Sequence, residues 1–127
     1  MATTATVVDR YDTVIKQGTT FRRTIYYRDE LGAIVDLTGA RVLFQIRESA
    51  DSADTLLDFD SDNLRDGQTI GPLNDTGTIS FVVSGDLTAV LDFSLAVWDM
   101  YVVFPGGEDD CLFEGKISLK KAVTRWR

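Results

Sequence analysis

The chain of 127 residues contains no histidine and a single cysteine, Cys111. The lack of histidine removes the commonest general base and the usual nucleophile–histidine–carboxylate triad. One cysteine excludes an intrachain disulfide and a cysteine-rich zinc site, and it fits a reducing cytosol. Because Cys111 stands beside Leu112 and Phe113 in a strand-like run, we predict a buried structural thiol.

Targeting and membrane signals are missing as well. The first nine residues have neither a basic region nor an apolar core, so no signal peptide is predicted. No apolar run approaches the roughly 20 residues of a membrane-spanning helix. The net charge of −7 argues against nucleic acid as a partner, because phosphate binding needs a basic surface. We therefore expect a soluble product whose partners are neither nucleic acid nor membrane.

Short alternating apolar and polar runs dominate what is present. They predict strands at residues 11–16, 20–28, 41–48, 55–59 and 78–83, and a last hairpin around the Pro-Gly-Gly-Glu-Asp-Asp turn. One helix of about two turns is predicted over residues 85–91, capped by Ser84 or Asp86. This pattern indicates an all-β, antiparallel immunoglobulin-like β-sandwich with one short helix, and a small closed barrel is the alternative.

The chain length fits one domain. We expect a flexible N-terminal arm over residues 1–10, the β-sandwich over residues 11–125 and a C-terminal tail of residues 126–127. Within the last hairpin, Trp98 shares a strand face with Met100 and is predicted to pack in the core. Asp99 takes the opposite face with Tyr101.

Four carboxylates match the first, third, fifth and ninth positions of a calcium-binding loop, namely Asp58, Asp60, Asp62 and Asp66. Two departures oppose a calcium site. Asn63 stands where the loop glycine belongs, and Thr69 stands where the bidentate glutamate belongs. We therefore interpret the segment as a solvated acidic loop, and we expect no metal.

Other chemical sites are not predicted either. Paired acids at residues 29–30 and 109–110 fall in turns, where acids are ordinary solvated turn formers. Gly106 and Gly107 open no helix that could hold a phosphate. We expect no catalytic residues and no cofactor, so the chain is predicted not to be an enzyme.

Charge is unevenly placed along the chain. Residues 50–65 carry five aspartates and one arginine, whereas residues 116–127 carry five basic residues and no acid. Contacts between copies could use this polarity. Trp126 stands between two arginines at the end of the chain, and both residue types are favoured interface anchors. The predicted interface consists of the arm 1–10 and of Lys120, Lys121, Arg125, Trp126 and Arg127.

Several strings resemble small virion proteins of tailed bacteriophages. They are Asp-Leu-Thr-Gly-Ala-Arg-Val-Leu-Phe-Gln-Ile-Arg at residues 36–47, Thr-Gly-Thr-Ile-Ser-Phe at residues 76–81, Leu-Thr-Ala at residues 87–89, Trp-Asp-Met at residues 98–100, Phe-Glu-Gly-Lys-Ile-Ser at residues 113–118 and Val-Thr-Arg at residues 123–125. Together they are similar to the N-terminal β-sandwich domain of phage baseplate upper proteins, over residues 14–125. The chain departs from that pattern because no helical linker or receptor-binding module follows the domain.

The resemblance implies a non-enzymatic structural role in a virion, after synthesis in the host cytoplasm. We expect an adaptor or decoration subunit that joins tail, baseplate, neck or capsid components, with other virion proteins as partners and as a homo-oligomer in the particle. The alternative is a carbohydrate- or receptor-binding β-sandwich module that uses exposed aromatic side chains, for which Tyr26, Tyr27 and Tyr101 are the candidates.

Overall fold

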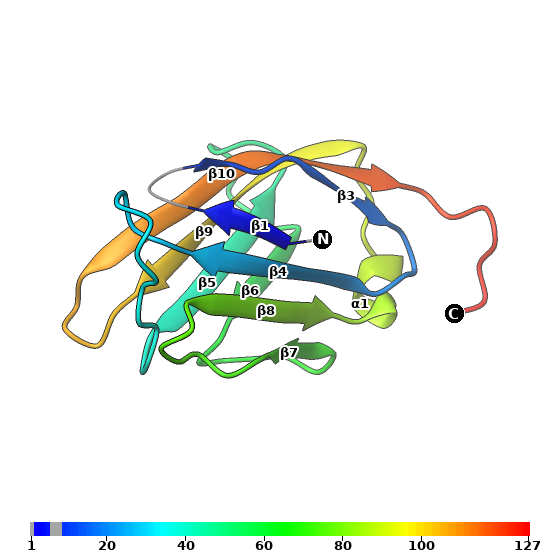
Figure 1. Cartoon of the computed structure of the whole chain (residues 1–127). Helices are drawn as coiled ribbons and strands as arrows, with labels where there is room; N and C mark the ends of the chain where they lie inside the picture. The colour runs from blue at the N-terminus through cyan, green and yellow to red at the C-terminus, as the bar shows by residue number, and fades with distance from the viewer. Residues whose placement is uncertain (1, 6–8) are drawn as a thin grey trace.

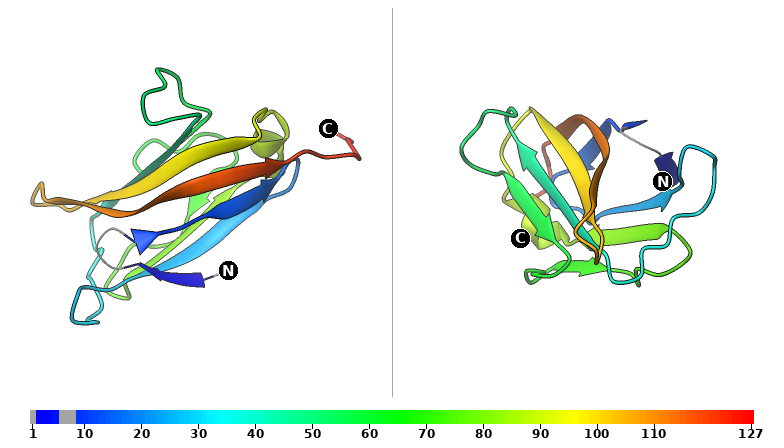
Figure 2. Two further views of the ribbon diagram at one scale, coloured as in Figure 1. Left: turned by 90° about the horizontal axis from the view of Figure 1, so that it is seen from above. Right: turned by 90° about the vertical axis from the view of Figure 1, so that its left-hand side faces the viewer.

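A computed structural model of the protein describes residues 2–5 and 9–127. Two β-sheets pack face to face and form an elongated sandwich (Figures 1 and 2). The first sheet has the strand order β1 (Ala2–Ala5), β4 (Phe21–Tyr27), β8 (Thr78–Val83) and β7 (Gln68–Ile70). The second has the order β2 (Asp9–Arg10), β10 (Asp109–Lys120), β9 (Leu95–Val103), β5 (Arg41–Arg47) and β6 (Leu57–Asp60), and β3 (Thr13–Lys16) also pairs with β10.

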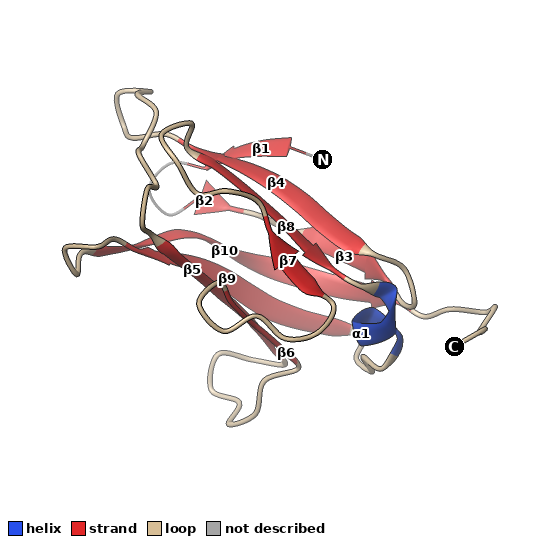
Figure 3. Ribbon diagram, turned by 90° about the horizontal axis from the view of Figure 1, so that it is seen from below, coloured by secondary structure: helices blue, strands red, loops and turns tan. Residues whose placement is uncertain are grey.

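This strand order is that of an immunoglobulin-like Greek key, so the predicted all-β sandwich is confirmed. The two sheets are separate layers in Figure 3, which rules out the closed barrel. The short helix is α1 (Gly85–Ala89), and Ser84 is its N-cap residue, although the Ser84 side chain makes no capping hydrogen bond. Among the residues that the structure describes, no helix combines the length and apolarity needed to cross a membrane.

The central strands form where the alternation predicted them. Strand β5 buries Val42, Phe44 and Ile46 and points its other side chains outward. Strand β7 was not predicted. The weak strand expected at residues 55–59 is β6, which begins two residues later and ends one residue later.

The N-terminal segment departs from a purely antiparallel arrangement. Strand β1 pairs parallel with β4, and β2 and β3 both pair parallel with β10. Parts of the predicted arm 1–10 therefore lie in both sheets. Met1 and residues 6–8 of that arm lie outside the described residues.

An aromatic cluster fills the space between the sheets. The Phe44 ring stacks on Phe59 with centroids 4.8 Å apart and meets the Trp98 ring edge-on at 5.7 Å. Trp98 also packs on Phe113, and its indole Nε1 donates a 2.8 Å hydrogen bond to the backbone oxygen of Tyr11. Since the buried indole N–H is satisfied, Trp98 is a core residue, as its strand face predicted.

Candidate functional site

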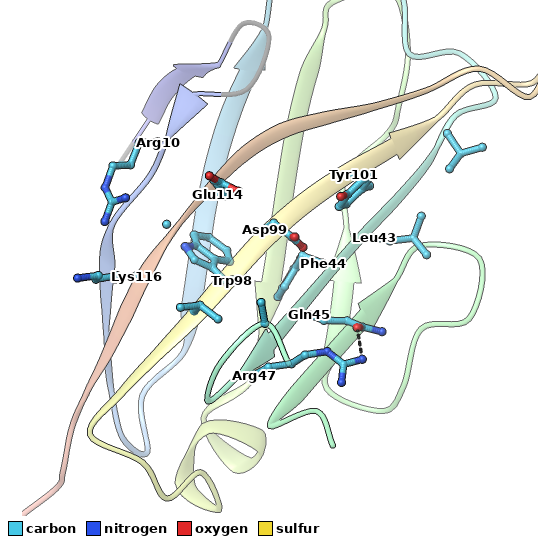
Figure 4. Close-up of a pocket in the computed structure, with 14 residues that line it drawn as sticks. Arg10, Leu43, Phe44, Gln45, Arg47, Trp98, Asp99, Tyr101, Glu114 and Lys116 are labelled. Carbon is cyan, nitrogen blue, oxygen red and sulfur yellow. Dashed lines mark hydrogen bonds between the residues drawn. The ribbon is translucent and has the colours of Figure 1, made fainter. Parts of the chain in front are cut away.

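A groove of about 670 Å³ lies on the outer face of the second sheet (Figure 4). Alternate residues of β5, β9 and β10 point away from the core and line it. The polar side chains of the groove include Gln45, Arg47, Asp99, Tyr101, Glu114 and Lys116. The sequence predicted the outward direction of Asp99 and Tyr101 but not the groove, because its hollow shape depends on how three strands are paired.

Two carboxylates face each other in this groove. Asp99 on β9 is paired directly with Glu114 on β10. Burial raises the pKa of Asp99, the nearby Glu114 charge raises it further, and Arg47 partly offsets the rise. Within the described part of the chain, neither carboxylate has an ion-pair partner. Like charges directly opposite each other destabilise a strand pair, so the Asp99–Glu114 pair is unfavourable for the fold.

Arg47 lines the groove but forms no ion pair with either carboxylate among the described residues. The Arg47 guanidinium donates to the backbone oxygen of Ser52 at 2.7 Å and to Gln45 Oε1 at 2.8 Å. These bonds hold Arg47 toward the loop after β5. The groove therefore offers carboxylate acceptors, a fixed guanidinium and an exposed tyrosine ring, a set suited to binding polar groups.

Cys111 lies on the same outer face, beside Tyr101. The predicted burial of its thiol is wrong, because the side chain is only half-buried. A β-bulge between Cys111 and Phe113 shifts the register and turns both Leu112 and Phe113 into the core, which leaves Cys111 on the outside. Burial and the charge of Asp99 raise the pKa of the Cys111 thiol, so it remains protonated at neutral pH.

The C-terminal segment folds back on the end of the sandwich instead of extending freely. Arg127 donates a 3.1 Å hydrogen bond to the backbone oxygen of Gly18 and pairs with Asp86 at 3.3 Å. Its guanidinium also stacks on the Trp126 ring, 4.1 Å from the centroid. A side chain at Gly85 would collide with Arg127, so this glycine makes room for the anchor.

The predicted interface residues therefore divide into two groups. Arg127 is held by its own chain and retains 26% side-chain exposure, and Lys121 pairs with Asp92 at 2.7 Å. Lys120, Arg125 and Trp126 remain exposed, and Trp126 keeps 74% of its surface in solvent. A second hollow, of about 420 Å³, lies between this segment and the turn after β3. The structure thus brings all five residues to one end of the molecule.

The mid-chain aspartates have internal partners. Arg41 donates to Asp60 through Nε at 2.9 Å and also pairs with Asp62 at 3.6 Å, while Arg65 pairs with Asp58 at 3.6 Å. The Arg41 hydrogen bond holds the pKa of Asp60 far below its usual range. Among the described residues, no cluster of three or more potential ligands gathers at a metal-binding distance.

The three candidate tyrosines do not form one aromatic platform. Tyr27 is buried, and its hydroxyl donates a 2.6 Å hydrogen bond to Asp110. Tyr26 is exposed on the outer face of the first sheet, whereas Tyr101 is exposed on the outer face of the second. Only Tyr101 lines the large groove.

Comparisons with known proteins give no family. The sequence matches no protein-family profile, and no curated protein is significantly similar to it. Among solved structures, an internalin-like protein of Listeria monocytogenes is similar over 93% of this chain, with 21% sequence identity and a TM-score of 0.33. The chain spans 29% of that protein. A likeness at this level carries no argument about function.

Proposed function

We propose that the protein is a non-enzymatic structural component of a tailed-phage virion, an adaptor or decoration subunit that joins neighbouring parts of the particle. The proposal combines the sequence resemblance described above with the geometry of the C-terminal segment. Binding uses protein surfaces presented by a rigid sandwich, without chemical transformation of a ligand.

The observation that carries the proposal is the exposed Trp126 on an anchored segment. Tryptophan and arginine are among the residues that most often dominate interface energies. Here the ring is fixed by the Arg127 guanidinium, which is itself bonded to Gly18 and Asp86. A side chain held in place before binding loses little conformational entropy when a partner docks.

The test is the protein composition of purified phage particles. The protein is expected in washed virions at a fixed ratio to the other structural proteins, measured by quantitative mass spectrometry. Trp126→Ala is expected to reduce its incorporation without changing the melting temperature of the isolated domain. Val90→Ala is the matched control, because Val90 is exposed on the same end but stands outside the C-terminal segment. Absence of the protein from virions would contradict the proposal.

The second candidate function is a carbohydrate- or receptor-binding module, and the groove on the outer face favours it. Tyr101 supplies an aromatic surface there, and Gln45, Asp99 and Glu114 supply hydrogen-bonding groups. A glycan array probed with the isolated domain tests this function. Binding that Tyr101→Ala removes and Tyr26→Ala retains would support it, and an array with no binding would eliminate it.

A further inference from the structure

The two ends of the sandwich carry opposite charge. Strand β10 has 12 residues and so spans about 40 Å, with the β9–β10 turn at one end and the C-terminal segment at the other (Figure 2). We call the first the acidic end and define it by Asp29, Glu30, Asp36, Asp75, Glu108, Asp109 and Asp110. We call the second the basic end and define it by Lys16, Lys120, Lys121, Arg125 and Arg127.

Contacts between three turns assemble the acidic end. The Tyr27 hydroxyl reaches Asp110, which joins the end of β4 to the start of β10. Gly39 packs against Pro105, and Gly77 packs against the backbone of Tyr27. These contacts bring the acidic residues of segments far apart in sequence to one end of the molecule.

The carboxylates of the acidic end lack internal ion pairs. In the described part of the chain, none of its seven acids lies within salt-bridge distance of a cation. Arg28, next to Asp29 in the chain, donates its hydrogen bond to the backbone oxygen of Gly32. The same end exposes two large apolar side chains, since Leu31 has 94% of its surface in solvent and Ile34 is also exposed.

The basic end is complementary to it. Asp86 and Asp92, two acids at this end, are already paired with Arg127 and Lys121. Lys16, Lys120 and Arg125 make no ion pair among the described residues. Trp126 and Val123, the latter 93% exposed, add an apolar surface beside these cations.

We propose that the basic end of one copy docks on the acidic end of a second copy, so that the chain assembles head to tail along the direction of β10. The occupant is a second copy because the two ends carry opposite charge and each exposes apolar side chains that the other end would cover. The contact cannot form within one molecule, since β10 separates the two ends. A contact of this kind is heterologous and produces a ring or a filament. This inference rests on the proposed structural role and names one partner for that role, a second copy of the chain.

The structure favours this pair of surfaces over the mid-chain acidic loop that the sequence pointed to. Three aspartates of that loop are paired with Arg41 and Arg65. Neutralised carboxylates attract a cationic partner weakly, whereas the acids of the acidic end have no such partners. The polarity expected from the sequence is therefore present, but a different set of acids forms its negative side.

The first experiment measures self-association of the full chain by sedimentation velocity across a wide concentration range. An acidic-end variant, Glu108→Lys with Asp109→Lys, and a basic-end variant, Arg125→Glu with Trp126→Ala, are each expected to weaken association at least about tenfold. The control variant, Glu48→Lys with Asp51→Lys, makes the charge change of the acidic-end variant in the exposed loop after β5 and is expected to associate like the wild type. Melting temperatures verify that all variants remain folded.

The second experiment mixes the two end variants. A head-to-tail contact predicts that the intact basic end of one variant binds the intact acidic end of the other, giving a one-to-one dimer that grows no further. The two altered ends are expected to remain unpaired, because Trp126→Ala removes the apolar anchor from the contact between them. Higher salt is expected to weaken the dimer, since the Debye length shortens from about 10 Å at 0.1 M to about 3 Å at 1 M.

Three results would overturn the inference. They are a wild-type chain that stays monomeric at every concentration, a control variant that loses association as strongly as the end variants, and a mixture that forms no dimer. Failure of the head-to-tail inference can be distinguished from failure of the proposed function. A chain present in virions but monomeric in solution and in mixtures would retain the structural role and lose only the head-to-tail contact.

Discussion

The two faces of the second sheet are built by the same three strands and differ in almost every physical property. Along β5, β9 and β10, one set of alternate residues meets in the aromatic cluster around Trp98, whose rings lie 4.8 to 6.0 Å from their neighbours. The other set forms the outer groove, where Asp99 faces Glu114 and, among the described residues, neither carboxylate forms an ion pair. The difference indicates that packing determines the inner face, whereas the outer face tolerates an unfavourable charge pair.

The contrast also separates stability from binding. An inner residue has its position fixed by many neighbours, so substitution there changes the free energy of unfolding. An outer residue of the groove contacts solvent and few neighbours, so substitution there changes what the surface can bind. Adjacent residues of one strand provide matched variants for this difference.

The largest expected effect comes from adjacent positions on β5. Phe44→Ala is expected to lower the free energy of unfolding by about 3–5 kcal/mol, because the stacked ring leaves a cavity. Leu43→Ala, on the outer face, is expected to cost no more than about 1 kcal/mol. Urea unfolding followed by fluorescence measures both. Equal losses would mean that the outer face contributes to stability as the core does.

An intermediate effect is expected where β10 approaches the N-terminal segment. A side chain at Gly115 would collide with the backbone oxygen of Tyr11, so Gly115→Ala must displace one of the two strands. We expect a loss of about 1–3 kcal/mol. Gly106→Ala is the control, because that glycine has open space around it and should change stability by less than about 0.5 kcal/mol. Thermal unfolding measures both variants. An unchanged melting temperature for Gly115→Ala would show that the two strands are not tightly packed at this point.

The smallest expected effect concerns the charge pair of the groove. The folded-state pKa of Asp99 is raised, so the folded protein holds this proton more firmly than the unfolded chain does. Its contribution to stability is present below the ordinary aspartate pKa of 3.8 and is lost as the pH rises through the raised value. Asp99→Asn should therefore stabilise the fold near neutral pH and flatten this part of the pH profile.

The matched control for this change lies in the opposite charge environment. The folded-state pKa of Asp60 is lowered by Arg41, so its contribution is present above the ordinary pKa and is lost in acid. Asp60→Asn should therefore destabilise the fold near neutral pH. Melting temperatures measured from pH 3 to pH 8 distinguish the two variants. If both variants shift stability in the same direction, the described charge environments are incorrect.

The sequence predicted the central strands well because each is a regular alternation of large apolar and polar residues. Val42, Phe44 and Ile46 repeat every second position, and this repeat alone defines β5 and its buried face. Strand β7 lacks such a signal. It has three residues, and its buried side chain is Gln68, whose amide donates a 2.8 Å hydrogen bond to the backbone oxygen of Asp58.

The candidate sites were predictable only in part. The position of Trp126 between two arginines is a local signal of an exposed anchor, but the anchoring of Arg127 depends on Gly18 and Gly85, which are distant in sequence. The pairing of Asp99 with Glu114 depends on a bulge in β10 that shifts the register between the strands. Properties that arise from register and from long-range contacts leave no local pattern in the residues.

The parallel pairing of β3 with β10 has a mechanical consequence. Four consecutive residue pairs join these strands, from Thr13 with Ile117 to Lys16 with Lys120. Tension between the two termini would pull the start of β3 and the end of β10 in opposite directions along their common axis. The hydrogen bonds between them would then be loaded in shear and would have to yield together, whereas a hairpin pulled from its open end unzips one bond at a time. The sandwich is therefore expected to resist tension along β3 and β10 more strongly than tension that separates the two strands sideways.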